Sequence, residues 1–232
     1  MATSLRSRVL AWLIRRHPTT YLRLKGLGVH RLGEARPFLA LHADLVAHNE
    51  GLLTLRERYN LWMLAGRVAA RPGAIAEFGV YRGASARVLA AAKGASPLYL
   101  FDTFSGLPAS DPSRDGAFVQ GEFADTRIEA VRASLAGWPE IYFCPGLFPE
   151  SAAALPPGLR FKLVHLDADL YSSTLEGLRF FYPRTLVGGV ILLHDYNDRT
   201  VPGVRAALDE FLGDKPEVLI EIWDTQALIV KQ

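Results

Sequence analysis

A short apolar run from Ile75 to Ser85 carries residue types that could bind a polar ligand. It reads I-A-E-F-G-V-Y-R-G-A-S, which places Glu77, Gly79 and Gly83 in the spacing E-x-G-x-x-x-G. Glycine has no Cβ, so a ligand can lie against such a turn and the backbone can take a positive φ. The amides that open the following Ala-rich helical pattern favour negative charge. We expect a strand, a tight turn and a helix start that suit a nucleoside; the alternative is glycine required only for packing.

A second apolar run, P-L-Y-L-F-D, ends in Asp102 about twenty residues further on. In nucleotide-binding α/β folds an acid at the tip of the second strand accepts hydrogen bonds from ribose hydroxyls. Because T-F-S-G follows, Asp102 could instead cap a helix. The two runs together favour a ligand that contains a ribose.

Two further apolar runs also end in acids, within V-H-L-D-A-D-L-Y-S-S-T and L-L-H-D-Y-N. Asp167 and Asp195 at neighbouring strand tips could hold a divalent cation through oxygen ligands, or one of them could act as a general base. His194 beside Asp195 could be a base, a metal ligand or a buried neutral imidazole.

These runs alternate with helical patterns, which indicates βαβ units and a largely parallel sheet buried on both faces. The expected strands cover 74–80, 98–102, 141–144, 161–166, 190–194, 218–222 and 227–230. The expected helices cover 52–70, 84–93, 126–136, 172–182 and 201–212, with a short helix near 149–155. Only W-D-T-Q separates the last two runs, so we expect a hairpin and a mixed edge. The long polar loop 103–125 starts where ligands bind in such sheets and is interpreted as a lid, with a loop of no function as the alternative.

Residues 1–50 are expected to form a basic helical arm ahead of a domain over 51–232, with breaks at Pro18, 26–28 and Pro37. Residues 1–36 hold eight basic residues and one acid, so their net charge is +7. Because the whole chain has a net charge of +2, the remaining residues carry −5. The helical spacing of Leu5, Val9, Trp12 and Leu13 indicates an amphipathic helix, docked on the domain or on a second subunit, or in contact with a membrane surface. No nucleic-acid module is visible, and the apolar run is too short to span a membrane. A single cysteine, Cys144, excludes an intrachain disulfide and favours a cytoplasmic protein.

Six segments together resemble the macrocin O-methyltransferase (TylF-like) family of class I S-adenosylmethionine-dependent methyltransferases. They cover roughly 52–212 and read E-F-G-V-Y-R-G-A-S, F-D-T-F-S-G-L-P, P-G-L-F-P-E-S, L-D-A-D-L-Y-S-S-T, F-Y-P-R-T-L-V-G-G-V-I-L-L-H-D-Y and P-G-V-R-A-A-L-D-E-F. The resemblance implies a Rossmann-like class I methyltransferase fold, an α/β fold with a mostly parallel seven-stranded sheet, helices on both faces and, in this chain, a helical N-terminal arm. It implies methyl transfer from S-adenosylmethionine to a hydroxyl of a small molecule, often a sugar of a natural product, with magnesium holding that hydroxyl.

The resemblance also assigns residues. The methionine end of the cofactor would be lined by Glu77, Gly79, Tyr81, Gly83 and Ser85, and the ribose would lie at Asp102 with Thr103 beside it. Asp167 matches the general base, and Asp167 and Asp195 match metal ligands.

One position departs from the family, which typically has Asp-Asp-Tyr where this chain has His194-Asp195-Tyr196. Histidine is a poorer ligand for magnesium than a carboxylate, so the ion could bind weakly, be replaced by a softer metal or be absent. His194 could also share or replace the base role of Asp167. The alternative functions are a metal-dependent, hydroxylase-type tailoring enzyme on the same fold and a non-catalytic scaffold. The apolar residues of the arm favour a homodimer.

Overall fold

A computed structural model describes residues 4–25, 35–48 and 51–232. Its centre is a seven-stranded sheet in the order β3-β2-β1-β4-β5-β7-β6. The strands are β1 (Ala74–Phe78), β2 (Leu98–Asp102), β3 (Ile141–Pro145), β4 (Phe161–Leu166), β5 (Thr185–Leu193), β6 (Ile220–Glu221) and β7 (Ala227–Val230). Strands β1 to β5 pair in parallel, whereas β7 pairs antiparallel with both β5 and β6. The predicted mostly parallel sheet with a mixed, hairpin-closed edge is confirmed.

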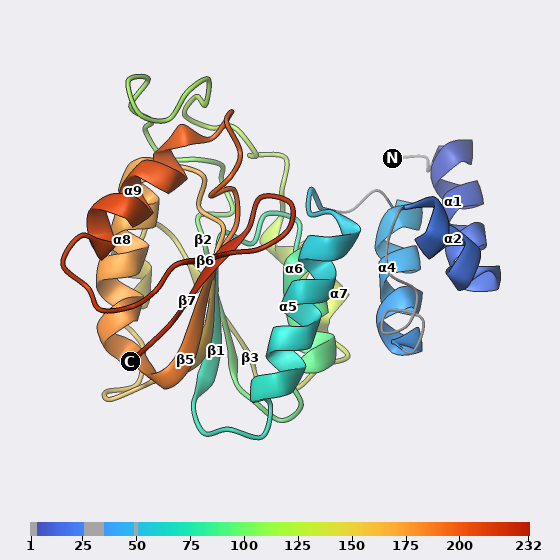
Figure 1. The fold of residues 1–232 in the computed structure, drawn as a ribbon, viewed down its shortest axis with the longest axis horizontal. Helices are drawn as coiled ribbons and strands as arrows, with labels where there is room; N and C mark the ends of the chain where they lie inside the picture. Colours follow the sequence, from blue (N-terminus) through green and yellow to red (C-terminus); the bar gives the residue numbers. More distant parts are fainter. Residues whose placement is uncertain (1–3, 26–34, 49–50) are drawn as a thin grey trace.

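Helices cover both faces of this sheet (Figure 1). One face carries α5 (Leu55–Val68), α6 (Ala84–Ala92) and α7 (Ile128–Leu135), and the other carries α8 (Tyr171–Phe181) and α9 (Pro202–Leu212). Two short 3₁₀ turns lie at Glu150–Ala152 and Tyr182–Arg184. Strands β1, β2 and β4 alternate buried side chains between the two resulting cores, so Ala76 and Phe78 pack toward α8 while Ile75 packs toward α5 and α6. Burial on both faces explains why these strands are almost entirely apolar.

Some boundaries differ from the sequence-based expectation. β5 begins at Thr185, five residues before the expected start, because the Gly188–Gly189 pair lies inside the strand. Gly188 has a φ of +70°, and the register between β4 and β5 shifts near this point. The strand also ends before His194, which lies in the loop that follows. Pro37 does not break the arm, because it is the second residue of α4 (Arg36–His48), where a missing N–H group costs little. The expected break at 26–28 lies outside the described residues.

The arm forms a helical layer beside α5, at the far side from α8 and α9 (Figure 1). It consists of α1 (Leu5–Arg16), α2 (Pro18–Leu24) and α4. Phe38 of α4 contacts Tyr59 and Trp62 of α5, with ring centroids 5.3 and 5.8 Å apart. Buried within the arm, the Tyr21 hydroxyl lies 3.2 Å from Nε2 of His42. Nδ1 of the same histidine lies 3.3 Å from the guanidinium of Arg58 on α5. The arm is therefore docked on the domain, as one of the alternatives predicted.

The docked face of α1 is mostly not the predicted one, although Leu13 of the predicted stripe does pack, partly buried, against the core of the arm. Ala11 and Ile14 are buried, whereas Leu5, Val9 and Trp12 are 77%, 56% and 56% exposed. Among the described residues, no helix is long and apolar enough to cross a membrane. Cys144 is half-buried, and its burial raises the pKa of the thiol to about 11.

Candidate functional site

A cavity of about 870 Å³ opens at the carboxyl ends of the parallel strands. Its wall takes residues from the loops after β1, β2, β4 and β5 and from the segment that joins the arm to α5. The predicted site residues that line it are Gly79, Tyr81, Ser85, Asp102, Thr103, Asp167, His194 and Asp195. Glu77 and Gly83 are not among the lining residues. The structure therefore brings the ends of four strands into one cavity, as the parallel topology requires.

Asp102 fixes the turn that it faces. Its Oδ2 accepts hydrogen bonds from the backbone amides of Val80 and Tyr81 at 2.7 and 2.8 Å, and its Oδ1 accepts one from the amide of Phe104 at 2.6 Å. Asp102 therefore does not cap a helix. Its carboxylate connects the β1–α6 turn to the loop after β2 through hydrogen bonds to both. An ionised carboxylate oxygen offers two lone pairs, so Oδ1 keeps one acceptor position toward the cavity.

The two glycines of the motif both have positive φ, +92° at Gly79 and +81° at Gly83. A Cβ on Gly79 would lie 1.7 Å from the backbone oxygen of Asp167, and one on Gly83 would lie 2.7 Å from the side chain of Val131. The space that a side chain would need is thus filled by protein. The glycines therefore let β1 approach the end of β4, and the helix start approach α7, as the packing alternative expected. That a ligand lies against the turn stays a prediction, and Gly79 does line the cavity.

Glu77 lies behind the cavity wall, fully buried in β1. Its Oε1 is 3.0 Å from Nδ1 of His165 on the neighbouring strand β4. Within the described residues its Oε2 has no hydrogen-bond partner. Burial raises the pKa of Glu77, and the contacts with His165 and Ser85 oppose this shift. Because Ser85 lines the cavity and Glu77 does not, the carboxyl supports the wall from behind.

Tyr81 and Thr103 are held by contacts around the cavity. Tyr81 has a φ of +49°, and its backbone oxygen accepts a hydrogen bond from the Thr126 hydroxyl. Its own hydroxyl donates to Asp125 at 2.7 Å, and Arg82 forms an ion pair with the same carboxylate. Thr103 donates to the backbone oxygen of Gly106 at 2.6 Å and thereby shapes the start of the 103–125 loop.

That loop forms one wall of the cavity through Leu107, Pro108 and Phe118. Asp115, which is 1% exposed, anchors it to α8. One Asp115 oxygen accepts from the amide of Tyr171 at 2.6 Å and the other from the amide of Asp111 at 2.8 Å. The loop is therefore an ordered part of the site, bonded to the helix that follows β4.

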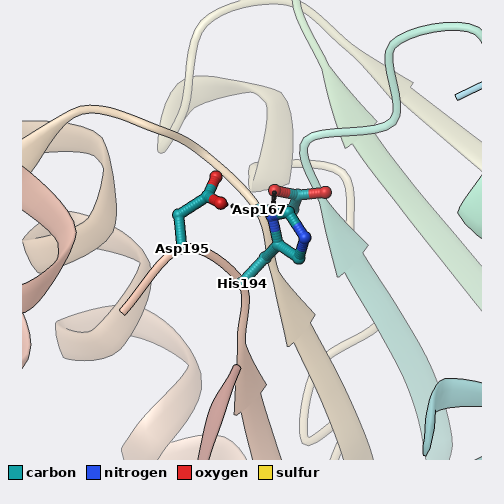
Figure 2. A group of neighbouring side chains, drawn as sticks. All are labelled: Asp167, His194 and Asp195. Carbon is teal, nitrogen blue, oxygen red and sulfur yellow. Dashed lines mark ion pairs between the residues drawn. The ribbon is translucent and has the colours of Figure 1, made fainter. Parts of the chain in front are cut away.

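Across β1 from Asp102, the side chains of Asp167, His194 and Asp195 converge from the ends of β4 and β5 (Figure 2). His194 Nδ1 lies 3.1 Å from Oδ1 of Asp167 and 3.0 Å from Oδ1 of Asp195. Each of these side chains offers one atom that could ligate a metal ion, and these atoms all lie within 4.8 Å of one another. Asp195 adopts a φ of +61° and its amide lies 3.2 Å from the Thr225 hydroxyl, so the β6–β7 turn helps to hold it.

Sequence reasoning missed one member of this cluster, Glu57 of α5. It closes a capping box with Thr54 at the start of α5. However, its Oε2 also lies 3.3 Å from Nε2 of His194, and its Oε1 accepts hydrogen bonds from the amide and hydroxyl of Thr225 at 3.1 and 2.7 Å. Glu57 is 1% exposed and lines the cavity. A capping box is a pattern of neighbouring residues, so it cannot predict a contact with Thr225, 168 residues further along the chain. Only the folded structure reveals this role of Glu57.

Charge pairing sets the protonation of this cluster. Burial lowers the pKa of His194, but the surrounding carboxylates of Asp167, Asp195 and Glu57 outweigh it and raise the pKa well above its ordinary value. Burial raises the pKa of Asp167, but His194 outweighs it, and the pKa lies below the ordinary value. At neutral pH the cluster therefore holds an imidazolium against an ionised Asp167. For nearby Asp169, burial and then the Asp167 charge raise the pKa well above its ordinary value.

The donor set bears on the magnesium that the family resemblance implies. Magnesium prefers six oxygen ligands in near-octahedral geometry, and this cluster offers an imidazole nitrogen between two carboxylates. Nδ1 of His194 lies about equally close to both carboxylates and supplies a positive charge between them. The residues present do not fit magnesium well; if any ion binds here, the mixed nitrogen and oxygen donors suit a softer divalent metal.

Known proteins share this sequence pattern and fold. Residues 60–223 match the family model described as macrocin-O-methyltransferase (TylF). A rhamnosyl-tetracenomycin C 4'-O-methyltransferase of Streptomyces olivaceus is 30% identical over 159 residues, which are 61% of this chain and 59% of that protein. Demethyldecarbamoylnovobiocin O-methyltransferase of Streptomyces niveus is 27% identical over 60% of this chain and 58% of its own length. The match thus spans about three fifths of these curated relatives.

Two solved structures share the fold. The calicheamicin methyltransferase CalS11 superposes with a TM-score of 0.68 at 21% identity, over 99% of this chain and 94% of its own. The O-methyltransferase NovP superposes with a TM-score of 0.64 at 23% identity, over 77% of this chain and 80% of its own. The Rossmann-like class I methyltransferase fold is therefore confirmed. Since the family model covers more than two thirds of the sequence, the chain belongs to the macrocin O-methyltransferase (TylF) family.

Proposed function

We propose that this protein transfers a methyl group from S-adenosylmethionine to a hydroxyl of a small molecule, a sugar or another part of a natural-product scaffold. The observation that carries the proposal is one cavity that is lined by the β1–α6 turn and Asp102 and also by Asp167 and His194. A cofactor and an acceptor can lie next to each other in such a cavity. The domain over 51–232 would supply this chemistry.

The residues at the turn suit the cofactor. Helix α6 begins after Gly83, which has no side chain to cap the first amides, so these amides can face the carboxylate of a methionine. Asp102 offers the remaining acceptor position of Oδ1 to a ribose hydroxyl. Tyr81, Ser85 and Thr103 line the same wall, and Glu77 supports Ser85 from behind. Bound S-adenosylmethionine would supply a methyl group activated by its sulfonium.

At the acceptor end, Asp167 is the proposed proton acceptor. A hydroxyl must lose its proton as its oxygen takes the methyl group, and an ionised carboxylate at the cavity wall can take that proton. His194 is proposed to act as a fixed cation instead of a base, because its raised pKa leaves it protonated at neutral pH. Its charge would stabilise negative charge that develops on the acceptor oxygen. Glu57 and Asp195 would hold the imidazolium in place.

The charge of the cavity wall bears on the acceptor. Eight acids line it: Glu57, Asp102, Glu150, Asp167, Asp169, Glu176, Asp195 and Asp198. Among the described lining residues, Arg82 and His194 are the side chains that can carry a positive charge, and each already faces carboxylates. We therefore propose an acceptor without phosphate or carboxylate near the reacting hydroxyl, which agrees with the rhamnosyl group in the name of the Streptomyces olivaceus relative.

The test measures S-adenosylhomocysteine formed from S-adenosylmethionine with a panel of uncharged glycosides, and with sugar nucleotides as the anionic comparison. The proposal expects turnover with at least one uncharged glycoside, and turnover slower by about 10² or more in the Asp167→Asn variant. Turnover that is equal in the Asp167→Asn variant would remove Asp167 from the mechanism. Turnover confined to the sugar nucleotides would overturn the assignment of an uncharged acceptor.

A further inference from the structure

The outer face of α1 combines exposed apolar side chains with arginines. Leu5, Val9 and Trp12 lie on this face and are 77%, 56% and 56% exposed. Since successive residues of an α-helix turn by about 100°, these side chains fall within an arc of about 60°. The opposite face of the helix, with Ala11 and Ile14, is buried in the arm. The apolar stripe is thus left over after the arm has docked.

Arginines border this stripe on both sides. By the same helical geometry, Arg8 and Arg15 lie along one edge, Arg6 lies along the other, and Arg16 ends the stripe at its C-terminal end. Arg15 already forms an ion pair with Asp44 of α4 at 3.6 Å. These arginine side chains are exposed. From residue 4 to residue 25 the sequence contains no aspartate or glutamate, whereas the chain outside residues 1–36 carries a net −5. The positive charge is therefore concentrated on the arm.

We propose that this face of α1 binds the surface of a membrane that contains anionic phospholipids. An interfacial helix lies in the plane of the membrane with Trp and Leu in the acyl boundary and with basic residues along its polar edges. Arginine stems can lie along the apolar layer while the guanidinium groups reach the phosphates. The exposed stripe and its arginine borders fit that arrangement.

The arrangement of charge favours a membrane over a second copy of the chain. Two copies related by a two-fold axis would present the same face to each other. The arginines along the two edges would then meet arginines of the other copy, without an acid in this helix to pair with them. A layer of anionic headgroups complements the same face, and each basic residue near it adds to the attraction.

The test is co-sedimentation of the full chain with vesicles of phosphatidylcholine alone and of phosphatidylcholine with phosphatidylglycerol. The wild type is expected to bind the vesicles with phosphatidylglycerol and to release them as salt rises. The variant Leu5→Ser/Val9→Ser/Trp12→Ser is expected to bind these vesicles at least about tenfold more weakly than the wild type. The variant Arg6→Gln/Arg8→Gln/Arg16→Gln is expected to lose the preference for phosphatidylglycerol.

The matched control is Val187→Ser/Val218→Ser/Trp223→Ser, which changes three apolar residues outside the arm that are 73%, 69% and 77% exposed. It should bind vesicles like the wild type. Circular dichroism and S-adenosylmethionine binding of each variant check that the fold is intact.

The proposal is overturned if the wild type binds neither kind of vesicle, or if the α1 serine variant binds as tightly as the control. It is also overturned if the serine variant changes the oligomeric state in sedimentation analysis but not vesicle binding, which would assign the face to a second copy. Vesicle binding needs no methyl transfer, so its outcome is independent of the proposed reaction.

Discussion

At the scale of single residues, the catalytic proposal rests on one histidine held among carboxylates. His194 lies within 3.3 Å of Asp167, Asp195 and Glu57. The carboxylates favour the charged form of His194, and His194 favours that of Asp167, so the pKa values of these two groups move apart. For Asp195, burial outweighs the contact with His194 and raises the pKa. The arrangement makes Asp167 an ionised proton acceptor and His194 a cation at neutral pH.

The first prediction concerns Asp167. The Asp167→Asn variant should lower kcat by about 10² or more, because an amide cannot take the proton of the acceptor. Binding of S-adenosylmethionine should remain, since the side chains of Asp102 and Asp167 follow β2 and β4, which lie on opposite sides of β1. Steady-state kinetics and calorimetric titration measure both. Asp214→Asn, an exposed acid outside the cavity, is the control and should retain wild-type kinetics. A variant with unchanged kcat would contradict the role of Asp167.

The second prediction concerns the metal. Wild-type turnover should persist after removal of divalent ions with a chelator, because His194 already supplies the positive charge. The His194→Asp variant restores the acid found in the family and should gain activity with added magnesium, since a third carboxylate replaces the imidazole. Turnover is measured with and without magnesium, and the metal content of the purified protein is measured alongside. Loss of wild-type turnover with the chelator, restored by magnesium, would contradict this account.

At the scale of elements, the site depends on how closely β1 and β4 approach at their carboxyl ends. Gly79 allows that approach, because a side chain there would overlap the backbone oxygen of Asp167. The spacing of glycines in the sequence predicted the turn, but not which surface the glycine faces. A glycine in the sequence does not show whether a ligand or a neighbouring strand occupies the space that its missing Cβ leaves.

The third prediction follows from that contact. Gly79→Ala should weaken S-adenosylmethionine binding and lower the melting temperature, because a Cβ 1.7 Å from a backbone oxygen forces β1 and β4 apart at a φ of +92°. Gly66→Ala is the matched control. That position lies inside α5 with nothing within 4 Å of its Cβ, so the variant should stabilise the protein by about 0.5–1 kcal/mol. Calorimetry and thermal denaturation compare the two, and equal behaviour would refute the packing argument.

The contact between the arm and α5 gives the fourth prediction. Burial and the nearby Arg58 charge lower the pKa of His42 from 6.5 to about 3, so folded His42 stays neutral. Between those two pH values the unfolded state binds more protons than the folded state. The free energy of unfolding should therefore fall as pH drops below 6.5, at up to about 1.4 kcal/mol per pH unit.

Urea denaturation between pH 7 and pH 4 measures this slope. His42→Gln should have a shallower slope than the wild type, because glutamine does not titrate. His48→Gln, on the exposed side of the same helix, should keep the wild-type slope. If the slope is the same in all three proteins, His42 does not carry the pH dependence.

At the scale of the whole molecule, most of the fold could be predicted from the sequence, because buried parallel strands and amphipathic helices have strong local patterns. β2 and β4 have the predicted bounds, and the short W-D-T-Q segment does join antiparallel strands. β5 starts earlier than predicted because a glycine pair inside a strand resembles a loop. The docked face of α1 was missed for a related reason, since both faces of that helix carry apolar residues.

The site was predictable only in part. The strand ends with Asp102, Asp167 and Asp195 do meet in one cavity, because parallel strands place their carboxyl ends on one edge. Glu57 joins them through a contact between α5 and the end of β5 that no sequence spacing encodes. Glu77 matches the family motif but lies behind the wall, since its strand position is buried on both sides.

The central claim is that the cavity binds S-adenosylmethionine across the β1–α6 turn and Asp102. Calorimetric titration of the wild type with S-adenosylmethionine tests it most directly. We expect saturable binding at one site per chain, and weaker binding in the Asp102→Ala variant. A wild type that is folded by circular dichroism but binds no S-adenosylmethionine and no S-adenosylhomocysteine would contradict it.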